Sequence, residues 1–238
     1  MKRLKKKMEE SLRTVRIVAT GSSNTEKSLN IENANSWFDW LDLGFRWWFG
    51  RLHVSINTGI SGQTSNQVLD RFEEDISLFK PFTVFITVGG NDSNPEKNIS
   101  LDQFKDNLRQ LIIKTRALEN CEPILQTYYA IDNSNMIKEG KEKHVNNFYN
   151  YMNGIVEVAE EHQVTVFNHT PRWVNYRNYS EESYRELMFD NMHLNALGHQ
   201  VWALDILRKF DVKPLEQMND VFAEALKVQN KFDELEVN

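Results

Sequence analysis

The sequence contains a single cysteine, Cys121, which excludes an internal disulfide and is consistent with a reducing compartment. Cys121 follows Asn120 and precedes Glu122 and Pro123, at the point where a buried strand is predicted to begin. The nearest charge is acidic, whereas a reactive thiolate needs a neighbouring positive charge. We therefore do not expect a catalytic thiol.

Long apolar runs are also missing. No stretch approaches the roughly 20 apolar residues that a helix needs to cross a bilayer. The chain begins with five basic residues among its first seven, but charged residues follow them instead of the apolar segment of a signal peptide. We expect a soluble, cytoplasmic protein without a transmembrane segment. Residues 1–14 are predicted to form a basic N-terminal extension, either a solvated tail or the first turn of a helix.

The sequence has no excess of positive charge. Its 28 Lys and Arg residues are outnumbered by 34 Asp and Glu residues, which gives a formal net charge of -6. Binding to phosphates depends on clustered Lys and Arg, so no nucleic-acid partner is expected. At 238 residues the chain is long enough for one substantial core. We predict a single domain over residues 1–238, with its core at about 15–210.

Five short apolar segments alternate with amphipathic helical patterns along this core. The predicted strands are 15–21, 53–57, 82–88, 123–129 and 164–168, and the main helices between and after them are 36–49, 68–79, 100–118, 145–159 and about 196–207. This alternation predicts an α/β protein with a parallel sheet and helices on both of its faces. A last amphipathic helix, 213–235, is expected to pack on the domain or on a second copy of the chain. A homo-oligomer is therefore one of the possible states of the protein.

Two segments are rich in aromatic residues. Residues 36–49 contain four tryptophans, mostly on one helical face, and we interpret the segment as core packing in preference to a substrate-facing wall or a subunit contact. Residues 171–188 contain more Tyr and Arg than a simple connection needs. They are predicted either to cover a cleft or to form a surface loop.

Polar residues suited to acyl transfer occur in three predicted loops. Ser23 follows the first strand, Asn91 follows the third, and Asp190 and His193 precede the last core helix. Loops after parallel strands converge at the carboxyl edge of the sheet. The spacing of Asp190 and His193 allows the carboxylate to fix one imidazole nitrogen and leaves the other nitrogen facing Ser23. The amides of Ser23 and Gly62 and the side-chain amide of Asn91 are candidate donors to an oxyanion.

The same residues carry a resemblance to a known family. The chain resembles the SGNH (GDSL-type) hydrolases in four ordered blocks, at residues 21–25 (GSSNT), 57–64 (NTGISGQT), 89–92 (GGND) and 190–195 (DNMHLN). The resemblance implies a flavodoxin-like three-layer αβα sandwich with a central five-stranded parallel sheet. It also implies a hydrolase of carboxylic esters without a metal or other cofactor. Under it Ser23 is the nucleophile, His193 and Asp190 complete the catalytic triad, and Ser23, Gly62 and Asn91 form the oxyanion hole.

Two alternatives stay open at this point. The family usually has Gly-Asp-Ser followed by an aliphatic residue in its first block, whereas this chain has Ser22 in place of the Asp and Asn24 in place of the aliphatic residue. The first alternative is therefore that the protein is a catalytically weak relative of these enzymes that is used for binding. Residues 20–25 also resemble the hydroxyl-rich phosphate loop of flavodoxins, so an FMN- or phosphate-binding module is a second alternative. That module leaves the 89–92 block and the Asp190/His193 pair unexplained.

Other polar residues near the blocks have simpler interpretations. Asp92 is expected to fix its turn, and His199 is expected to be structural within a helix. Asp190, His193 and His199 match no known metal spacing, so no metal is expected. The Trp, Tyr and Arg residues around the predicted cleft favour short acyl (acetyl) esters of carbohydrates or small alcohols as substrates.

Overall fold

A parallel sheet of five strands forms the centre of the protein. The structure is a computed structural model, and it describes residues 2–27, 35–50, 52–212 and 216–237. The strands lie in the order β2-β1-β3-β4-β5, and all neighbouring pairs are parallel. They are β1 (Val15–Gly21), β2 (His53–Gly59), β3 (Thr83–Thr87), β4 (Glu122–Gln126) and β5 (Thr165–Phe167). The predicted α/β class and the flavodoxin-like strand order are confirmed.

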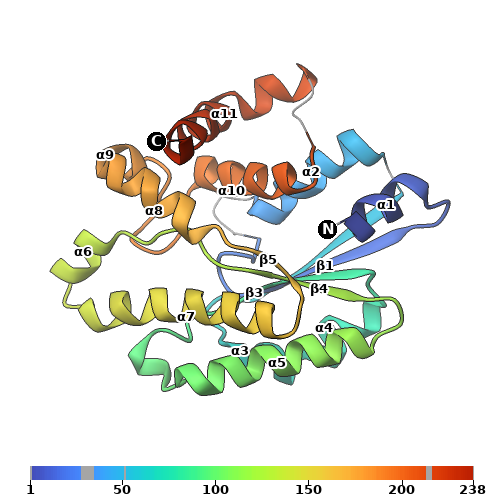
Figure 1. The fold of residues 1–238 in the computed structure, drawn as a ribbon, viewed down its shortest axis with the longest axis horizontal. Helices are drawn as coiled ribbons and strands as arrows, with labels where there is room; N and C mark the ends of the chain where they lie inside the picture. Colours follow the sequence, from blue (N-terminus) through green and yellow to red (C-terminus); the bar gives the residue numbers. More distant parts are fainter. Residues whose placement is uncertain (1, 28–34, 51, 213–215, 238) are drawn as a thin grey trace.

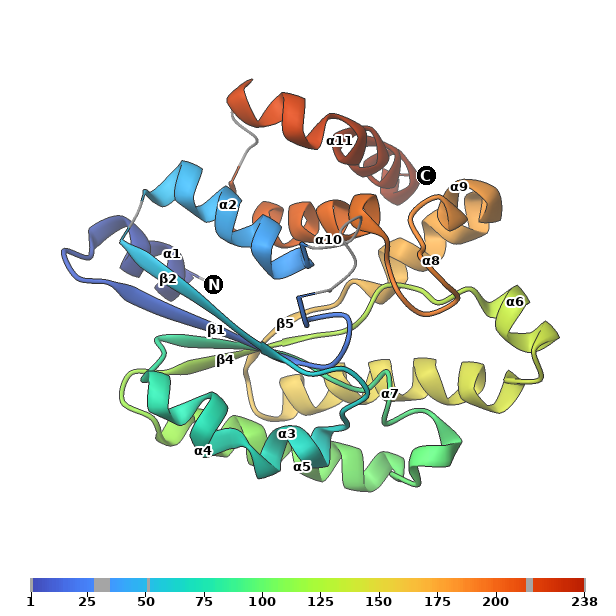
Figure 2. The ribbon, with the colours of Figure 1, turned by 180° about the vertical axis from the view of Figure 1, so that it is seen from behind.

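Helices cover both faces of the sheet and make it the middle of three layers (Figures 1 and 2). One face carries α3 (Ser65–Asp70), α4 (Phe72–Asp75), α5 (Leu101–Ala117) and α7 (Glu142–Glu161), and the other carries α2 (Trp37–Phe49), α10 (Ala196–Lys209) and, outside them, α11 (Glu216–Val237). The remaining helical segments are α1 (Lys2–Glu10), η2 (Ser77–Phe79), η3 (Pro95–Lys97), α6 (Asn133–Lys138), α8 (Thr170–Tyr179) and α9 (Glu181–Arg185). Because both faces are covered, every residue of β3 is buried, which explains why its three central residues, Val84, Phe85 and Ile86, are all apolar.

The strand order creates a crevice at the carboxyl ends of β1 and β3. These strands are neighbours, but the chain leaves β1 toward α2 on one face and leaves β3 toward α5 on the other (Figure 1). The two connections therefore diverge, and open α/β sheets bind their ligands at such a point. Ser23 follows β1 and Asn91 follows β3, so both lie at this crevice.

The tryptophan-rich helix α2 packs into the domain. Trp37 is fully buried over the sheet, whereas Trp40 and Trp47 pack on Phe222 of α11 with ring centroids 5.5 and 6.5 Å apart. Core packing of this helix is confirmed, because α11 covers the side of α2 that the sheet does not reach. The fourth tryptophan of this segment, Trp48, differs from the predicted core packing, because it is 37% exposed. Residues 213–215, with which the last helix was predicted to begin, lie outside the described residues.

Two further segments differ from their predicted form. The expected helix 68–79 is divided into α3, α4 and η2, because the Arg71 side chain at the first break is drawn to the sheet and donates to the carbonyls of Thr58 (2.6 Å) and Gly21 (3.1 Å). Residues 171–188 were expected to cover a cleft or to form a surface loop, but most of them belong to α8 and α9. The side chains of Trp173 and Tyr184 in these helices are fully buried.

The basic N-terminal segment forms helix α1 at the amino ends of the strands. Its apolar residues Leu4 and Met8 are buried, and Arg3 pairs with Glu122 at the start of β4 at 2.7 Å. A solvated tail is therefore excluded for residues 2–10. Within the described part of the chain, each helix is too short or too polar to span a membrane.

Candidate active site

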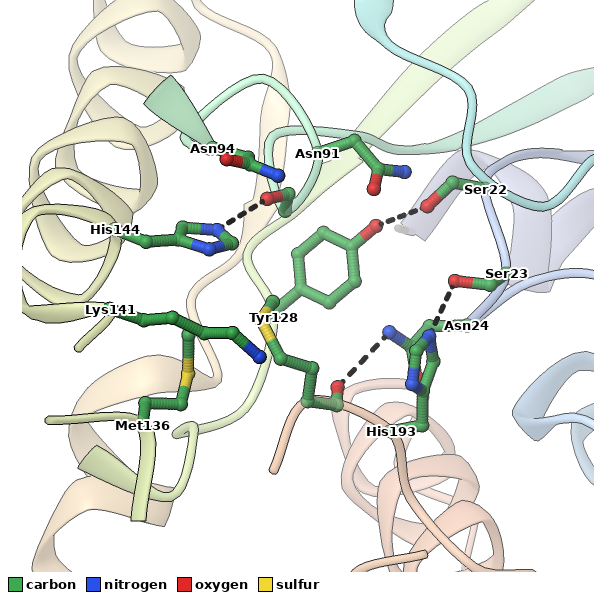
Figure 3. A pocket seen from close by; sticks show the side chains of 12 residues that line it. Ser22, Ser23, Asn24, Asn91, Asn94, Tyr128, Met136, Lys141, His144 and His193 are labelled. Atoms are coloured by element: carbon green, nitrogen blue, oxygen red, sulfur yellow. Dashed lines mark hydrogen bonds between the residues drawn. The ribbon is translucent and has the colours of Figure 1, made fainter. Parts of the chain in front are cut away.

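Three side chains from two distant parts of the sequence form one hydrogen-bonded chain at the crevice. Ser23 Oγ lies 2.8 Å from His193 Nε2 (Figure 3). On the other side of the ring, His193 Nδ1 lies 2.8 Å from Asp190 Oδ2. Ser23 is half-buried, whereas the side chains of His193 and Asp190 are 39% and 48% exposed. The predicted convergence of these loops is thus present in the structure. In this arrangement the hydroxyl has a proton acceptor, and the acceptor is held by a carboxylate.

The tight turn after β1 presents Ser23 to the crevice. The backbone N–H groups of Thr25 and Glu26 both donate to the Ser22 carbonyl at 2.9 Å, which closes the turn around Ser23. Gly21 is required just before it, because a Cβ atom there would lie 2.3 Å from the Thr87 carbonyl oxygen of β3. The small residues of this block therefore reflect close packing of the turn against the sheet.

A second turn holds the histidine. Asp190 Oδ1 accepts hydrogen bonds from the backbone N–H groups of Met192 and His193, both at 2.7 Å, and Asp190 Oδ2 faces the imidazole. Partial burial on its own raises the pKa of Asp190, but the hydrogen bonds from His193 and from the two backbone amides outweigh it. The pKa of Asp190 is therefore lowered. The carboxylate stays ionised and fixes both the loop and the ring.

The predicted oxyanion donors other than Ser23, which are Asn91 and Gly62, belong to two loops that are hydrogen-bonded to each other. Asn91 Nδ2 donates to the Gln63 carbonyl at 2.8 Å, so the Asn91 side chain is tied to the loop that carries Gly62. Gly62 adopts a φ of 76°, in the left-handed region that favours glycine, and it is exposed. Twelve of the described residues line the neighbouring cavity; Asn91 and Ser23 are among them and Gly62 is not.

Asp92 fixes the turn that presents Asn91, as predicted. Its buried carboxylate accepts the Ser65 N–H at 2.9 Å and the Gly89 N–H at 3.2 Å, and it also accepts the Ser65 hydroxyl. Burial is the largest influence on this carboxyl and raises the pKa of Asp92, although these hydrogen bonds oppose the change. Asp92 is directed into the fold between β3 and α3 and therefore serves the structure of the turn.

A small polar cavity of about 230 Å³ adjoins Ser23 (Figure 3). It is lined by Ser22, Ser23, Asn24, Gly90, Asn91, Asn94, Tyr128, Met136, Lys141, His144, Met192 and His193. Lys141 is exposed and pairs with Glu139 at 2.7 Å. His144 is buried with its Nε2 3.2 Å from the Gly90 carbonyl, and burial lowers its pKa, so the ring is neutral at pH 7. Sequence reasoning did not identify Lys141 or His144, because no spacing relates them to the other site residues.

Two tyrosines that sequence reasoning also missed contact the turn around Ser23. Tyr128 Oη lies 3.0 Å from Ser22 Oγ, and Tyr129 Oη lies 2.5 Å from Asn24 Oδ1. Both tyrosines had been assigned to the fourth strand, which was predicted to continue to Tyr129. The strand β4 ends at Gln126, so both residues follow it; Tyr128 lines the cavity, and Tyr129 is buried beneath the serine turn's Asn24.

The structure does not favour a phosphate loop after β1. Thr20 and Thr25, whose hydroxyls would line such a loop, are fully buried, and Ser22 is hydrogen-bonded to Tyr128. His199 is also structural, as expected. Its Nδ1 accepts the backbone N–H of Trp37 at 3.2 Å, and burial lowers its pKa to about 3. Among the described residues, no three His, Cys, Asp or Glu side chains are grouped as metal ligands would be.

Comparison with known proteins identifies relatives of this arrangement. The model of the GDSL-like lipase/acylhydrolase family matches residues 19–201. An acetylxylan esterase from Geobacillus stearothermophilus is 28% identical over 165 residues, which cover 65% of this chain and 70% of the esterase. An uncharacterized lipoprotein, YqeF, from Bacillus subtilis (strain 168) is 32% identical over 127 residues, or 50% of each chain.

Solved structures share the fold. The crystal structure of the Geobacillus stearothermophilus acetylxylan esterase superposes with a TM-score of 0.70 at 21% identity, over 84% of this chain and 96% of that one. A putative GDSL-like lipase from Parabacteroides merdae superposes with a TM-score of 0.71 at 19% identity, over 85% and 99% of the two chains. Forms of the Geobacillus esterase with a serine, a histidine or an aspartate replaced by alanine are described as catalytic mutants.

Proposed function

The chain belongs to the GDSL-like lipase/acylhydrolase family, a family of ester hydrolases, and on this premise we propose that it cleaves carboxylic esters with Ser23 as nucleophile. His193 is the general base and Asp190 orients it. The observation that carries the proposal is the continuous chain of two 2.8 Å contacts from Ser23 Oγ through the imidazole to Asp190. The three residue types replaced in the catalytic mutants of the Geobacillus esterase are the same.

The proposed reaction proceeds through an acyl-enzyme. Ser23 Oγ attacks the ester carbonyl carbon while its proton passes to His193 Nε2, and the resulting tetrahedral intermediate carries an oxyanion. As the intermediate collapses, the C–O bond to the alcohol breaks and His193 returns the proton to the departing oxygen. Water then attacks the acyl group by the same route and releases the acid. Because the imidazole activates the nucleophile, we include independence from metal ions in the proposal, and EDTA should leave kcat unchanged.

The oxyanion needs donors that are in place before the reaction. We assign the Ser23 and Gly62 backbone amides and the side-chain amide of Asn91 to this role. Asn91 Nδ2 carries two hydrogens, and its bond to the Gln63 carbonyl uses one of them. That bond fixes the plane of the amide, and the second hydrogen remains for the substrate oxygen.

The cavity favours a small acyl group and a hydroxylated alcohol. Its volume of about 230 Å³ is below the roughly 300–1,000 Å³ of sites that enclose drug-sized ligands, so a long acyl chain has no enclosed space there. The side chains of Asn91, Asn94, Lys141 and Tyr128 supply polar atoms to its lining. We therefore propose short acyl esters, acetyl above all, of carbohydrates or small alcohols as the substrates.

A panel of esters tests this proposal. Nitrophenyl esters of two, four, eight and twelve carbons should show kcat/KM falling with chain length, and acetylated sugars should release acetate. The Ser23→Ala protein is the control and should hydrolyse none of these esters above background. Equal activity of the Ser23→Ala protein would overturn the role of Ser23, and a maximum at long chains would overturn the proposed acyl specificity.

A further inference from the structure

The two tyrosines that follow β4 contact the residues on either side of Ser23. Tyr128 Oη lies 3.0 Å from Ser22 Oγ, and Tyr129 Oη lies 2.5 Å from Asn24 Oδ1. Both tyrosine side chains are at most 2% exposed. Ser22 and Asn24 are also the two positions at which the first block departs from the usual family sequence. Both of the residues that differ from the family pattern are therefore hydrogen-bonded to a tyrosine.

Tyr129 reaches the histidine loop as well as the serine turn. Its Oη lies 2.5 Å from the Met192 carbonyl. Asn24 Nδ2 donates to the same carbonyl at 3.4 Å (Figure 3). Three residues after Tyr129, the backbone N–H of Asp132 donates a hydrogen bond to the Asn191 carbonyl of the histidine loop at 3.0 Å. One segment after β4 thus holds both the turn that carries Ser23 and the loop that carries His193.

The position of the Tyr129 hydroxyl is fixed by the packing of its ring. The ring centroid lies 5.2 Å from that of Trp202, 5.5 Å from that of Trp173 and 6.1 Å from that of Tyr128. Burial raises the pKa of Tyr129 well above its usual value, so the hydroxyl keeps its proton throughout the working pH range. A rigid ring and a neutral hydroxyl make a fixed spacer between the two loops.

We propose that Tyr129 and Asn24 form a positioning pair that sets the distance between Ser23 Oγ and His193 Nε2, while Tyr128 holds the other side of the serine turn through Ser22. The proposal rests on the catalytic roles of Ser23 and His193 given above. Neither tyrosine touches the reacting atoms in this account. The tyrosines determine the fraction of molecules in which the serine hydroxyl and the imidazole are aligned for proton transfer. Because small misplacements of reacting groups reduce rates strongly, losing this alignment should lower kcat.

The test compares Tyr129→Phe with the matched control Tyr184→Phe. Tyr184 is also fully buried, its ring centroid lies 6.3 Å from that of Trp173, and its hydroxyl donates to the Ala130 carbonyl. Among the described residues, its hydroxyl makes no hydrogen bond to the serine turn or to the histidine loop. Each variant loses one buried hydroxyl, so similar decreases in Tm are expected. Only Tyr129→Phe should lower kcat, by about tenfold or more, with KM for a nitrophenyl acetate within about twofold of the parent value. The rate of fluorophosphonate labelling of Ser23 should fall by the same factor.

Equal kcat in the parent and both variants would overturn the proposal, as would equal losses of kcat in the two variants. If Tyr129→Phe does not fold, Asn24→Ala carries the same expectations. If both fold, the double variant should be no slower than the slower single variant, because the two residues act through one contact; multiplied losses would contradict a shared role. A parent protein that is not labelled at Ser23 would mark failure of the proposed function, whereas a labelled parent with an unaffected Tyr129→Phe variant removes only this inference.

Discussion

Replacement of Asp190 by asparagine tests the orientation of the imidazole without removing a side chain. In the parent protein Asp190 Oδ2 faces His193 Nδ1 at 2.8 Å, and Oδ1 accepts two backbone N–H groups at 2.7 Å. Asparagine keeps an oxygen for the backbone amides, which places its NH₂ group against the imidazole. His193 Nδ1 must then accept a hydrogen bond, so the proton of the neutral ring moves to Nε2. A protonated Nε2 cannot take the proton of Ser23.

The expected loss is large. An aspartate-to-asparagine change in a serine protease triad lowers kcat by about 10⁴-fold, which corresponds to roughly 5 kcal/mol of activation free energy. Here the Asp190 side chain is 48% exposed, so water can replace part of the lost interaction. We therefore expect kcat to fall by about 10³- to 10⁴-fold. The free energy of unfolding should change by less than about 1 kcal/mol, as is typical of an exposed pair.

Steady-state hydrolysis of nitrophenyl acetate measures this effect. KM should stay within about twofold of the parent value, because the change acts on proton transfer and not on ground-state binding. Asp102→Asn, which alters an exposed aspartate at the start of α5, is the control and should behave as the parent does. An Asp190→Asn protein that keeps more than about a tenth of the parent kcat would refute the role assigned to the carboxylate.

Three further outcomes are expected. kcat/KM should fall on the acid side, because a general base must be unprotonated to accept the Ser23 proton; an unchanged acid limb in His193→Gln would contradict the assignment of His193 as that base. Asn91→Ala should lower kcat by about 10²- to 10³-fold and raise KM less, and an effect on KM alone would exclude Asn91 from the oxyanion hole. Asp205→Ala should lower the free energy of unfolding by about 3–5 kcal/mol without changing the kcat of the folded protein, because the buried Asp205 carboxylate accepts hydrogen bonds from Trp173 (2.7 Å) and Gln229 (2.9 Å). Urea titration measures this loss of stability, and a loss below about 1 kcal/mol would contradict the prediction.

The same carboxylate gives a pH dependence of stability. Burial alone raises the pKa of Asp205, but the hydrogen bond to His169 and the interactions with its other partners outweigh burial, and the pKa is lowered. Its stabilising effect is therefore complete above the unfolded pKa of about 3.9 and is lost as the pH falls through the lower folded value. Below about pH 4 the Tm of the parent should approach that of Asp205→Ala.

The parts of the site that could be predicted were those set by chain direction and short spacing. Ser23 and Asn91 each follow a strand of a parallel sheet, so the topology alone brings them to one edge. Asp190 and His193 are three residues apart, and their contact is a property of one turn. These relations are visible in a sequence because they do not depend on how distant side chains pack.

The contributions of Tyr128, Tyr129 and His144 could not be predicted in this way. The sequence from Pro123 to Tyr129 is equally compatible with a strand of seven residues and with the observed strand that ends at Gln126. Which way the next side chains point is decided by the packing of rings such as Trp202 and Trp173, which come from α10 and α8. The division of the predicted helix 68–79 has a similar origin, because the Arg71 guanidinium binds carbonyls of β1 and β2.

Mass spectrometry of the fluorophosphonate-treated protein tests whether Ser23 is the nucleophile. We expect one adduct, on the peptide that contains Ser23 and located at Ser23 itself, with loss of ester hydrolysis in proportion to labelling. The Ser23→Ala protein should take up no label and should retain no esterase activity. Labelling confined to Ser22, or full ester hydrolysis by the Ser23→Ala protein, would contradict the account.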